Sequence, residues 1–481
     1  MSKRIAPREY KGSITIFSAL LFILICMVLI AQFQSAIYYS QHADAERAAN
    51  FSCDGFLAGY CRPLREDYGI LAVDGGFGQH HFQMAAVQEV LLLAFEKNYR
   101  RGSSIEEPIC TMLLDDDWEL FLRELHLACP EDDDRPEVQS VLEAYRQGER
   151  AVLADFEARQ SEAGHENTEG EENQSETPAD NEIRDPRDFL NKIWKQGILA
   201  AACPSGYRIS NRELRVLELP FTVEKDELPL AMDFKDEKAV GEFLKGWKAG
   251  KEPVVKEAEV PIYIQKVFQN ASEGSKNPSG RNRSLQYEVE YILAGHGTDR
   301  ENLEAILWKL LIFRTVLNME HILASPDKKL QTQETALVLS SAMAMPWLSK
   351  VLDGLLQFTW AFAEGLADCR CLLKGGRIPI FKDSASWHLS WEAMLSLSEA
   401  VLDGAEGVKG LSYNEYLFVL LEMMDLKTQC MRMANLIEQN IQLVPGYENF
   451  HMHNCIYGIQ TRFQCKSSIG HEFQVQAAGA Y

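Results

Sequence analysis

The longest run of apolar residues lies near the N-terminus, from Ile14 to Ala31, and is interrupted by only two hydroxyl residues. As an α-helix this run spans about 27 Å, close to the roughly 30 Å thickness of a bilayer's hydrocarbon core. Beyond it no glycine or proline occurs before Gly55, and the residues in between include many alanines. The pattern predicts one long helix over residues 12–55, with residues 14–34 crossing a membrane and the remainder forming a stem outside it.

Charged residues before this run predict its orientation. Residues 1–11 contain four basic side chains and a single acidic one, Glu9. By the positive-inside rule they form a basic cytoplasmic tail, and the bulk of the chain is extracytoplasmic. A cleaved signal peptide is the competing interpretation, but its apolar core normally has roughly 7–15 residues and is followed by a break in the helix. The longer run and the unbroken helix favour a retained, single-pass anchor in the cell membrane.

Helical and strand patterns are mixed farther along the chain. Residues 56–160 form a membrane-proximal, mainly helical region, with a helix predicted over 82–99. Three later stretches have the branched and aromatic content of strands. They are RVLELPFTV at 215–223, VPIYIQKVF at 260–268 and LQYEVEYIL at 285–293, the last of which alternates strictly.

A helical block follows these predicted strands. Thr298 and Glu301 have the spacing of a capping box, and the apolar residues after them recur on one helical face. Further helices are predicted from about Gln331, from Pro346 to the two glycines at 375–376, and, as one amphipathic helix, over 413–441. The chain ends in two strand-like segments, IYGIQTRFQC and EFQVQAAGAY, which predict a terminal β-hairpin. The fold class is therefore α+β: a long N-terminal transmembrane and stem helix, then a mixed strand and helical-bundle region.

Charge and composition add two constraints. The formal net charge of −22 argues against a nucleic-acid partner, because phosphate binding requires a basic face. Between Ser161 and Asp180 there are seven acidic residues, no Lys or Arg, and no Val, Ile, Leu, Met, Cys or aromatic residue. Such a segment cannot bury a core, so residues 161–187 are predicted to be a disordered acidic linker before a C-terminal α+β domain over 188–481.

The cysteines and a run of aspartates leave alternatives open. Ten of the eleven cysteines lie outside the apolar run and can pair if the chain is exported; because they are widely scattered, free buried thiols are the alternative. The run Asp115–Asp117 precedes a predicted helix, where acidic residues cap free N–H groups and complement the helix dipole. We favour capping over a cation site, because no calcium-loop spacing follows.

The N-terminal sequence resembles a known family. The residues from Gly12 to Phe17, the apolar run after them and the alanine-rich helix containing Asp44 are similar to the start of TadE/TadG-like pseudopilins of the tight-adherence (Flp) pilus system. Gly12 and Phe17 are accordingly the candidate residues of a processing or membrane-entry motif. Prepilins of this kind usually carry a glutamate a few residues after the cleavage glycine, and here those positions are Ile, Thr, Ile and Phe. The resemblance therefore implies a permanently anchored, TadG-like accessory protein rather than a polymerising subunit.

A second resemblance covers much more of the chain. LQYEVEYILAGHGTDRENL, WAFAEGLADCRCLLKGG, LSYNEYL and the terminal strand pair are similar, in this order, to an uncharacterised (domain-of-unknown-function) family of single-span membrane proteins. Gram-positive bacteria carry that family, typically beside tight-adherence pilus genes. The match covers Gly12 to about Gly78 and Leu285 to the end, and it is weak over 101–282. It implies a location and a pilus association, and no reaction.

One predicted helical face gathers polar residues. Trp360, Glu364 and Asp368 are spaced four residues apart, so they share a face of the helix after Pro346. Two carboxylates one turn apart can act as acid and base or hold a metal. No nucleophile, histidine or phosphate loop stands at a motif spacing nearby. We interpret the three residues as a structural polar cluster with a buried ion pair, and Arg314 is the suggested partner.

A histidine-rich segment is the other candidate for metal ligands. On a strand, His451 and His453 share a face, with Cys455 nearby, but a third ligand at a defined spacing is missing, which favours a surface turn. Cys369 and Cys371 lack the CxxC spacing of redox motifs. No GxSxG, Walker or dinucleotide motif occurs. The sequence therefore assigns no catalytic, cofactor-binding or metal-binding residue, and it predicts no cofactor and no enzyme activity.

These patterns lead to one functional hypothesis and two alternatives. We expect a non-enzymatic, membrane-anchored extracytoplasmic accessory protein of a tight-adherence pilus or surface-adhesion system, with the lipid bilayer and other pilus-assembly or envelope proteins as partners. The first alternative is an anchored, exported hydrolase or metal-dependent enzyme that uses Glu364 and Asp368 or a metal near His453. The second is a ligand-binding receptor, which needs a partner subunit because a cytoplasmic tail of about eleven residues leaves no room for an output domain.

Overall fold

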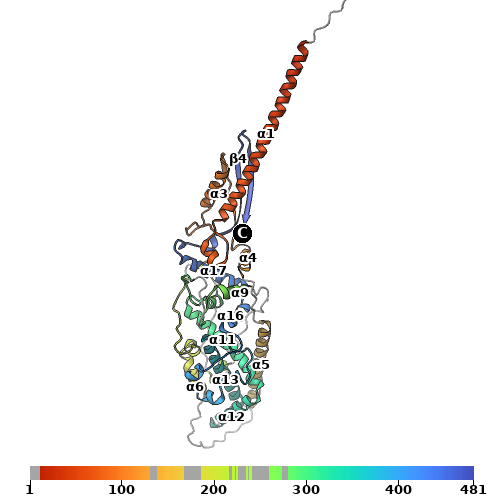
Figure 1. Cartoon of the computed structure of the whole chain (residues 1–481). Helices are drawn as coiled ribbons and strands as arrows, with labels where there is room; N and C mark the ends of the chain where they lie inside the picture. The colour runs from red at the N-terminus through yellow and green to blue at the C-terminus, as the bar shows by residue number, and fades with distance from the viewer. Residues whose placement is uncertain are drawn as a thin grey trace, which may run out of the picture. The chain divides into compact units, whose positions relative to one another are not determined.

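The structure is a computed structural model of the chain (Figure 1), which forms two compact units. Unit 1 comprises Met1–Arg65, Ile70–Phe121 and Asn449–Tyr481, and unit 2 comprises Glu66–Gly69 and Leu122–Glu448. In sequence, most of unit 2 is an insertion between two parts of unit 1. The residues that the structure describes are 11–129, 138–166, 186–215, 219–222, 224–225, 234–236, 238–240, 259–272, 280–343 and 345–481.

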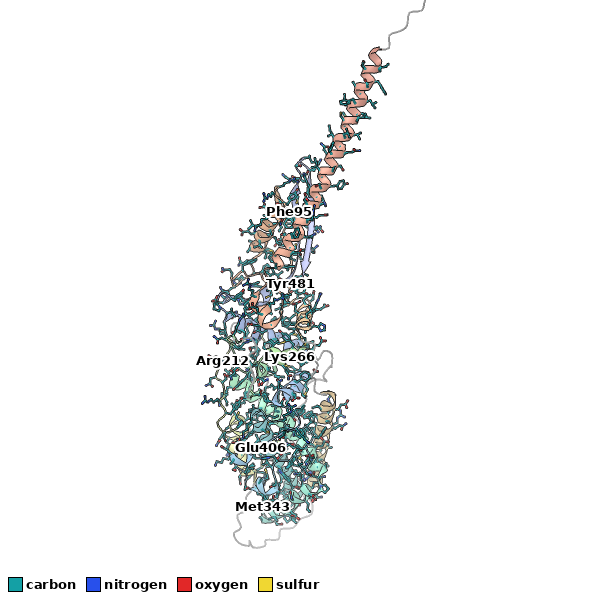
Figure 2. All side chains as sticks on the ribbon, viewed as in Figure 1. Phe95, Arg212, Lys266, Met343, Glu406 and Tyr481 are labelled. Carbon is teal, nitrogen blue, oxygen red and sulfur yellow. The ribbon has the colours of Figure 1, made fainter. Side chains whose placement is uncertain are left out.

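A single helix, α1 (Lys11–Leu57), dominates unit 1 and confirms the long helix that the apolar run predicts. From Ile14 to Ile37 its large hydrophobic side chains are exposed (Figure 2), and its most apolar stretch has a mean hydropathy of 3.0. Figure 1 shows this first half standing free of the strands, while the second half lies against them. The second half buries one face of mostly small residues at helical spacing: Gln41, Ala45, Ala48, Ala49, Ser52, Cys53 and Phe56. The helix is long and apolar enough to cross a membrane, a property that a signal sequence shares.

The sheet of unit 1 is built on β4 (Cys455–Lys466), which pairs antiparallel with each of the other described strands. β5 (Glu472–Ala480) runs along one side of β4, from Gly458 opposite Ala480 to Lys466 opposite Glu472. On the same side as β5, the short strand β1 (Val73–Asp74) pairs with the first two residues of β4. The other side of β4 pairs with two short strands, β3 (Ile109–Met112) and β2 (Ser103–Ile105). β4 and β5 confirm the predicted terminal hairpin.

One hydrophobic core joins α1, the sheet and α3 (Met84–Asn98). Alternate residues of β4 and β5, such as Phe463 and Val475, are buried in it while their neighbours are exposed. Phe95 of α3 stacks on Phe463 with the ring centroids 4.1 Å apart. α1 packs tightly on β5, since a Cβ atom at Gly479 would lie 3.0 Å from Leu57 Cδ1 and 3.5 Å from Cys53 Cβ.

In its described residues unit 2 consists of helices and loops. Its longest buried helices, α11 (Asp299–Ala324) and α13 (Ser349–Leu373), pack against each other and against α12 (Pro326–Ala342) and α5 (Val138–Glu166). The shorter elements within it are α6 (Pro186–Trp194), α7 (Ile198–Ala202), α9 (Glu259–Val267), α10 (Glu288–Ala294), η3 (Pro346–Leu348), α14 (Trp391–Leu395), α15 (Glu399–Asp403), α16 (Tyr413–Glu422) and α17 (Leu426–Gln442). Among the described residues, the remaining short elements are α2 (Arg62–Tyr68), η1 (Asp116–Trp118), α4 (Glu119–Ala128) and η4 (Met452–Asn454).

Two of the predicted strands are wrong, because they are helices. VPIYIQKVF forms most of α9, and LQYEVEYIL leads into α10; the described residues of RVLELPFTV form no strand. In LQYEVEYIL the two glutamates that alternate with the apolar residues, Glu288 and Glu290, are fully buried. Alternation does not distinguish a strand from a helix when all side chains of the segment lie inside the protein.

Helix boundaries also differ from the prediction. The helix expected over 413–441 is two helices, because Asp425 caps α17 by accepting a hydrogen bond from the Thr428 N–H. Thr298 caps α11 as predicted, through the Glu301 N–H at 3.2 Å. A full capping box is instead present at Ser412.

Two acidic segments need correction as well. Asp115 accepts a hydrogen bond from the Met112 N–H and makes no side-chain cap on the following helix. The predicted linker begins inside α5 and ends inside α6, so residues 161–166 and 186–187 are helical. The middle of that linker, 167–185, lies outside the described residues, as do residues 1–10 of the predicted tail.

Replacing Phe463 with alanine should destabilise unit 1, because it removes the ring stacked on Phe95 and leaves a cavity in a fully buried site. We expect the free energy of opening to fall by about 3–5 kcal/mol. Hydrogen exchange of the β4 and β5 amides in the full-length protein measures this opening. The control is Gln464→Ala, an exposed neighbour whose effect should stay within about 0.5 kcal/mol. Equal amide protection in the two variants would contradict the assigned core.

Candidate functional site

The residues singled out on α13 lie in a buried charge cluster of unit 2. Glu364 and Asp368 both contact the ammonium group of Lys382, which comes from the loop after α13; Lys382 Nζ lies 2.6 Å from Asp368 Oδ1. Glu364 also accepts hydrogen bonds from the backbone N–H groups of His388 and Leu389, each at 2.7 Å. The three charged side chains are at most 1% exposed. Lys382 therefore links both carboxylates to one loop.

Arg314 of α11, the partner that the sequence suggested, lies on the other side of Asp368. Its Nε donates to Asp368 Oδ2 at 2.9 Å, and Asn318 Nδ2 donates to the same oxygen at 3.2 Å. Nη1 of Arg314 donates to the carbonyl oxygens of Pro379 and Ile380, both at 3.0 Å. The cluster thus holds two cations and two carboxylates, and each carboxylate oxygen has at least one donor.

Aromatic rings form one wall of this cluster. The indole N–H of Trp360 donates to the Leu389 carbonyl at 2.9 Å, and the ring packs against Trp387 and Trp391. Lys328 Nζ lies 4.3 Å from the Trp360 ring centre and 3.9 Å from that of Trp387. Burial lowers the pKa of Lys328 to about 8. The two rings hold this amine by cation–π attraction and exclude water from one side of the cluster.

The arrangement fastens a loop to the helical core, and each of its two carboxylates accepts three hydrogen bonds from protein donors. Burial raises the pKa of Asp368, but attraction to Lys382 and Arg314 outweighs burial and holds the pKa below its ordinary value. Asp368 is therefore ionised at neutral pH and cannot donate a proton as a general acid. A hydrolase that uses Glu364 and Asp368 gains no support from this geometry.

The other predicted site residues lie apart from the cluster. Gly12 and Phe17 fall in the first turns of α1, and Phe17 is exposed. His451 Nε2 lies 3.2 Å from His80 Nδ1, a contact that the sequence did not suggest, and His453 belongs to η4. Among the described residues no group of three or more His, Cys, Asp or Glu side chains is placed to hold a metal ion. No disulfide joins the described cysteines.

The charge cluster falls within a segment that matches a known family. The model of a family of unknown function (DUF5702) matches residues 176–467, more than half of the chain. The chain belongs to the DUF5702 family. This agrees with the uncharacterised domain family that the second resemblance implied. The DUF5702 match includes all of α13 and ends just after β4, so it leaves α1 outside. No curated protein and no solved structure matches the chain.

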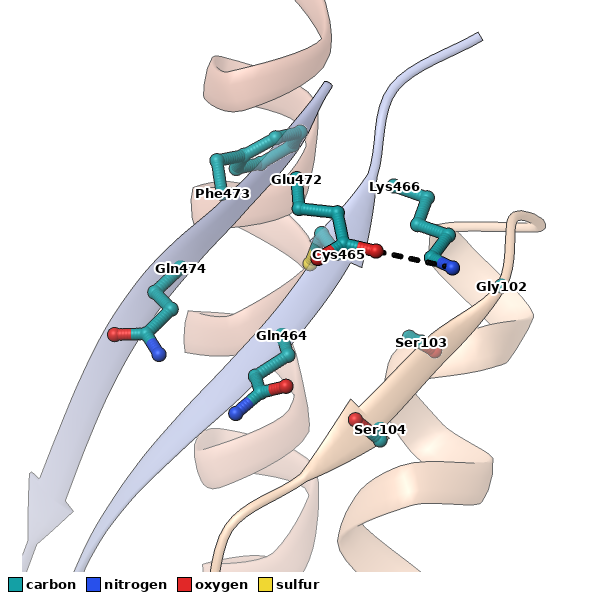
Figure 3. Close-up of a pocket in the computed structure, with 9 residues that line it drawn as sticks. All are labelled: Gly102, Ser103, Ser104, Gln464, Cys465, Lys466, Glu472, Phe473 and Gln474. Atoms are coloured by element: carbon teal, nitrogen blue, oxygen red, sulfur yellow. Dashed lines mark ion pairs between the residues drawn. The ribbon is translucent and has the colours of Figure 1, made fainter. Parts of the chain in front are cut away.

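A hollow of about 590 Å³ lies in unit 1, at the last residues of the DUF5702 match. Figure 3 shows it between β2, the end of β4 and the start of β5. Lys466 and Glu472 form an ion pair at 3.0 Å at its edge, and Gln464 is exposed on the outer face of the sheet. Burial raises the pKa of the Cys465 thiol to about 11, so this cysteine is not a thiolate nucleophile at neutral pH.

A second hollow, of about 490 Å³, lies in the DUF5702 segment of unit 2, and Ala271 is one of its lining residues. Glu290 accepts hydrogen bonds from the Ala271 N–H and the Tyr413 hydroxyl, both at 2.8 Å. Its other oxygen, Oε2, is buried without a hydrogen-bond partner among the described residues. Burial raises the pKa of Glu290 to about 7. Sequence analysis did not single out this carboxyl, because it lies in a segment whose alternation predicted a strand.

Replacing Lys382 with methionine should destabilise unit 2 by about 3–5 kcal/mol, because two buried carboxylates then share one cation. Urea denaturation followed by tryptophan fluorescence reports this loss, since Trp360, Trp387 and Trp391 line the cluster. The matched control is Lys409→Met, an exposed lysine, which should change stability by less than about 0.5 kcal/mol. Adding Glu364→Gln to Lys382→Met should recover part of the lost stability. If the stability changes of the two single variants simply add in the double variant, the ion pair between Lys382 and Glu364 would be contradicted.

Glu290 should make the free energy of unfolding depend on pH, with stability falling as the pH rises. Its pKa is about 7 in the folded chain against an ordinary value of 4.5, so the folded state binds the proton more tightly. The resulting stabilisation, about 3 kcal/mol, is complete below the unfolded pKa and is lost as the pH rises through the folded pKa. Urea denaturation of Glu290→Gln should show a flatter slope than the wild type between about pH 5 and pH 8. Identical slopes would show that Glu290 is ionised throughout this range.

Proposed function

We propose that the chain is a membrane-anchored extracytoplasmic accessory protein of a tight-adherence (Flp) pilus or a related surface-adhesion system. In this proposal residues 14–34 of α1 span the membrane once and the N-terminus is cytoplasmic. Unit 2 and the part of unit 1 that follows this span lie on the extracytoplasmic side, and the DUF5702 segment contacts other envelope proteins.

The change of environment along α1 is the observation that carries this proposal. The helix is apolar from Ile14 to Ala31 apart from two hydroxyl residues, and it stays exposed up to Ile37. From Gln41 one face is buried against an antiparallel sheet, with no break between the two halves. Pilin-like subunits use one helix in this way, with the first half in lipid and the second half packed on a sheet. Exposed apolar surface of this extent is unfavourable in water and favourable in a bilayer.

Two observations favour an accessory role over a polymerising one. The positions after Gly12 lack the glutamate that prepilins usually carry. The large unit 2 is inserted between Phe121 and Asn449 of unit 1. A bulky domain carried by every subunit is unfavourable in a closely packed filament, whereas it is compatible with a protein present in few copies.

Membrane retention is the first test. The full-length protein from its host membranes should begin at Met1 or Ser2 by intact mass and resist carbonate extraction. Leu24→Arg places a charge near the middle of the span and should reduce the membrane-bound fraction, because insertion then costs roughly 2.5–3.5 kcal/mol more. The matched control, Asn50→Arg, lies on an exposed position of the stem and should leave the fraction unchanged.

The alternatives give different masses. A chain that begins beyond the apolar run and is released by carbonate would mean a cleaved signal sequence, and the anchor would be rejected. A chain beginning at Ser13 would mean prepilin-type processing and a pilus subunit. The pilus association is tested separately by in-membrane cross-linking to the host's pilus-assembly proteins and by loss of surface pili on deletion of the gene. Normal pili and no such cross-links would reject that part of the proposal.

A further inference from the structure

The turn between β4 and β5 is fixed to α1 near the end of the apolar half. Gln41, which is buried, donates through Nε2 to Ser468 Oγ at 2.6 Å and accepts from the Ser468 N–H at 2.9 Å. The turn closes with the Gly470 N–H donating to the Ser467 carbonyl at 2.9 Å, and Gly470 has a φ of +88° that suits glycine. These bonds tie the hairpin to one level of the helix.

Aromatic contacts also place the β4–β5 turn beside this part of α1, and they show the direction in which the hairpin runs. The Tyr38 ring lies 6.4 Å from that of His471 and 5.6 Å from that of Phe473, measured between centroids. At the other end of β5, Gly479 lies beside Leu57. α1 and β5 therefore run in the same direction, and the turn points toward the free half of α1, as Figure 1 shows.

The rise per residue of α1 gives the distance of the β4–β5 turn from the hydrocarbon core of the membrane. Gln41 follows Gln34, the last residue of the proposed span, by seven residues, so it lies about 10 Å beyond the hydrocarbon core along the helix. Each head-group layer is about 5–8 Å thick, because a bilayer of 40–45 Å contains a hydrocarbon core of roughly 30 Å. The turn residues Ile469 and Gly470 lie on the membrane side of Gln41. They therefore fall within the head-group layer or at its outer surface.

The side chains at this level suit a lipid interface. Tyr39 is 69% exposed, Ile469 is half-buried and His471 is exposed. Tyrosine is enriched where a membrane protein crosses from hydrocarbon to water, since its ring is apolar and its hydroxyl polar. The fixed charges of the turn balance, because Lys466 pairs with Glu472 at 3.0 Å. Contact between the β4–β5 turn and lipid head groups therefore does not require anionic lipid.

We propose that the β4–β5 turn, together with Tyr38 and Tyr39 of α1, forms a second membrane contact that lies in the lipid head-group layer. The inference rests on the proposed anchoring of α1. The contact makes the sheet of unit 1 touch the same bilayer that α1 spans, which fixes the depth and tilt of unit 1. The partner is the phospholipid head group itself, whatever its charge.

A photoreactive diazirine amino acid at Ile469 tests this contact in the full-length protein reconstituted into vesicles. One set of vesicles contains phosphatidylcholine alone, and the other also contains phosphatidylglycerol. After illumination, mass spectrometry should find lipid adducts at position 469 in both sets, at least severalfold above those at Gln460. Gln460 is an exposed residue of β4 about 20 Å farther along the strand. Labelling at 469 that equals the Gln460 background would overturn the contact, and so would labelling confined to anionic vesicles.

Two further variants separate this inference from the anchoring on which it rests. A probe at Leu24 should label lipid strongly; if it does not, the anchor itself fails. If Leu24 labels and Ile469 does not, the anchor stands and only the second contact is rejected. Inserting Ala-Gln-Ser-Ala after Ser35 adds about one helical turn and moves the hairpin about 6 Å outward without touching the packed half. Lipid adducts at 469 should then fall severalfold, and unchanged labelling would contradict the derived depth.

Discussion

The continuous backbone hydrogen bonding of α1 is the constraint on which the rest of unit 1 depends. Because no glycine or proline interrupts residues 13–54, the apolar half and the packed half cannot turn or slide relative to each other. The small residues of the packed half allow close approach to the sheet, and Gln41 ties the hairpin to one level of the helix. The packed half thereby fixes the position of the β4–β5 hairpin along the helix.

The sequence predicted best what local residues determine. The long helix, the terminal hairpin and the Thr298 cap all depend on neighbours along the chain, and the structure has all three. β2 and β3 were missed because each has only three or four half-exposed residues, and they are strands only by pairing with β4, far away in the sequence. α10 was mistaken for a strand because its glutamates are buried by tertiary packing, which no local pattern reports.

The charge cluster shows the same limit. Spacing placed Glu364 and Asp368 on one face, and Arg314 was a reasonable partner since it belongs to a strongly patterned helix. Lys382 lies in a loop without periodicity, so nothing in the sequence marked it as the cation shared by both carboxylates. Breaking such a buried pair leaves an uncompensated charge, which makes the cluster a strong constraint on this loop even if its net contribution to stability is small.

The position of β4 near the C-terminus has a consequence for biogenesis. α1 and the short strands β1, β2 and β3 are synthesised first, yet their shared partner arrives only after the whole of unit 2. Strand pairings between residues so far apart in the sequence form late in folding. Until they form, the unpaired edges of the early strands are prone to aggregation. Unit 2 can therefore fold while unit 1 is still open, and a chain that stops before Cys455 lacks the strand that closes it. The sheet of unit 1 is complete only after β4 and β5 have been synthesised.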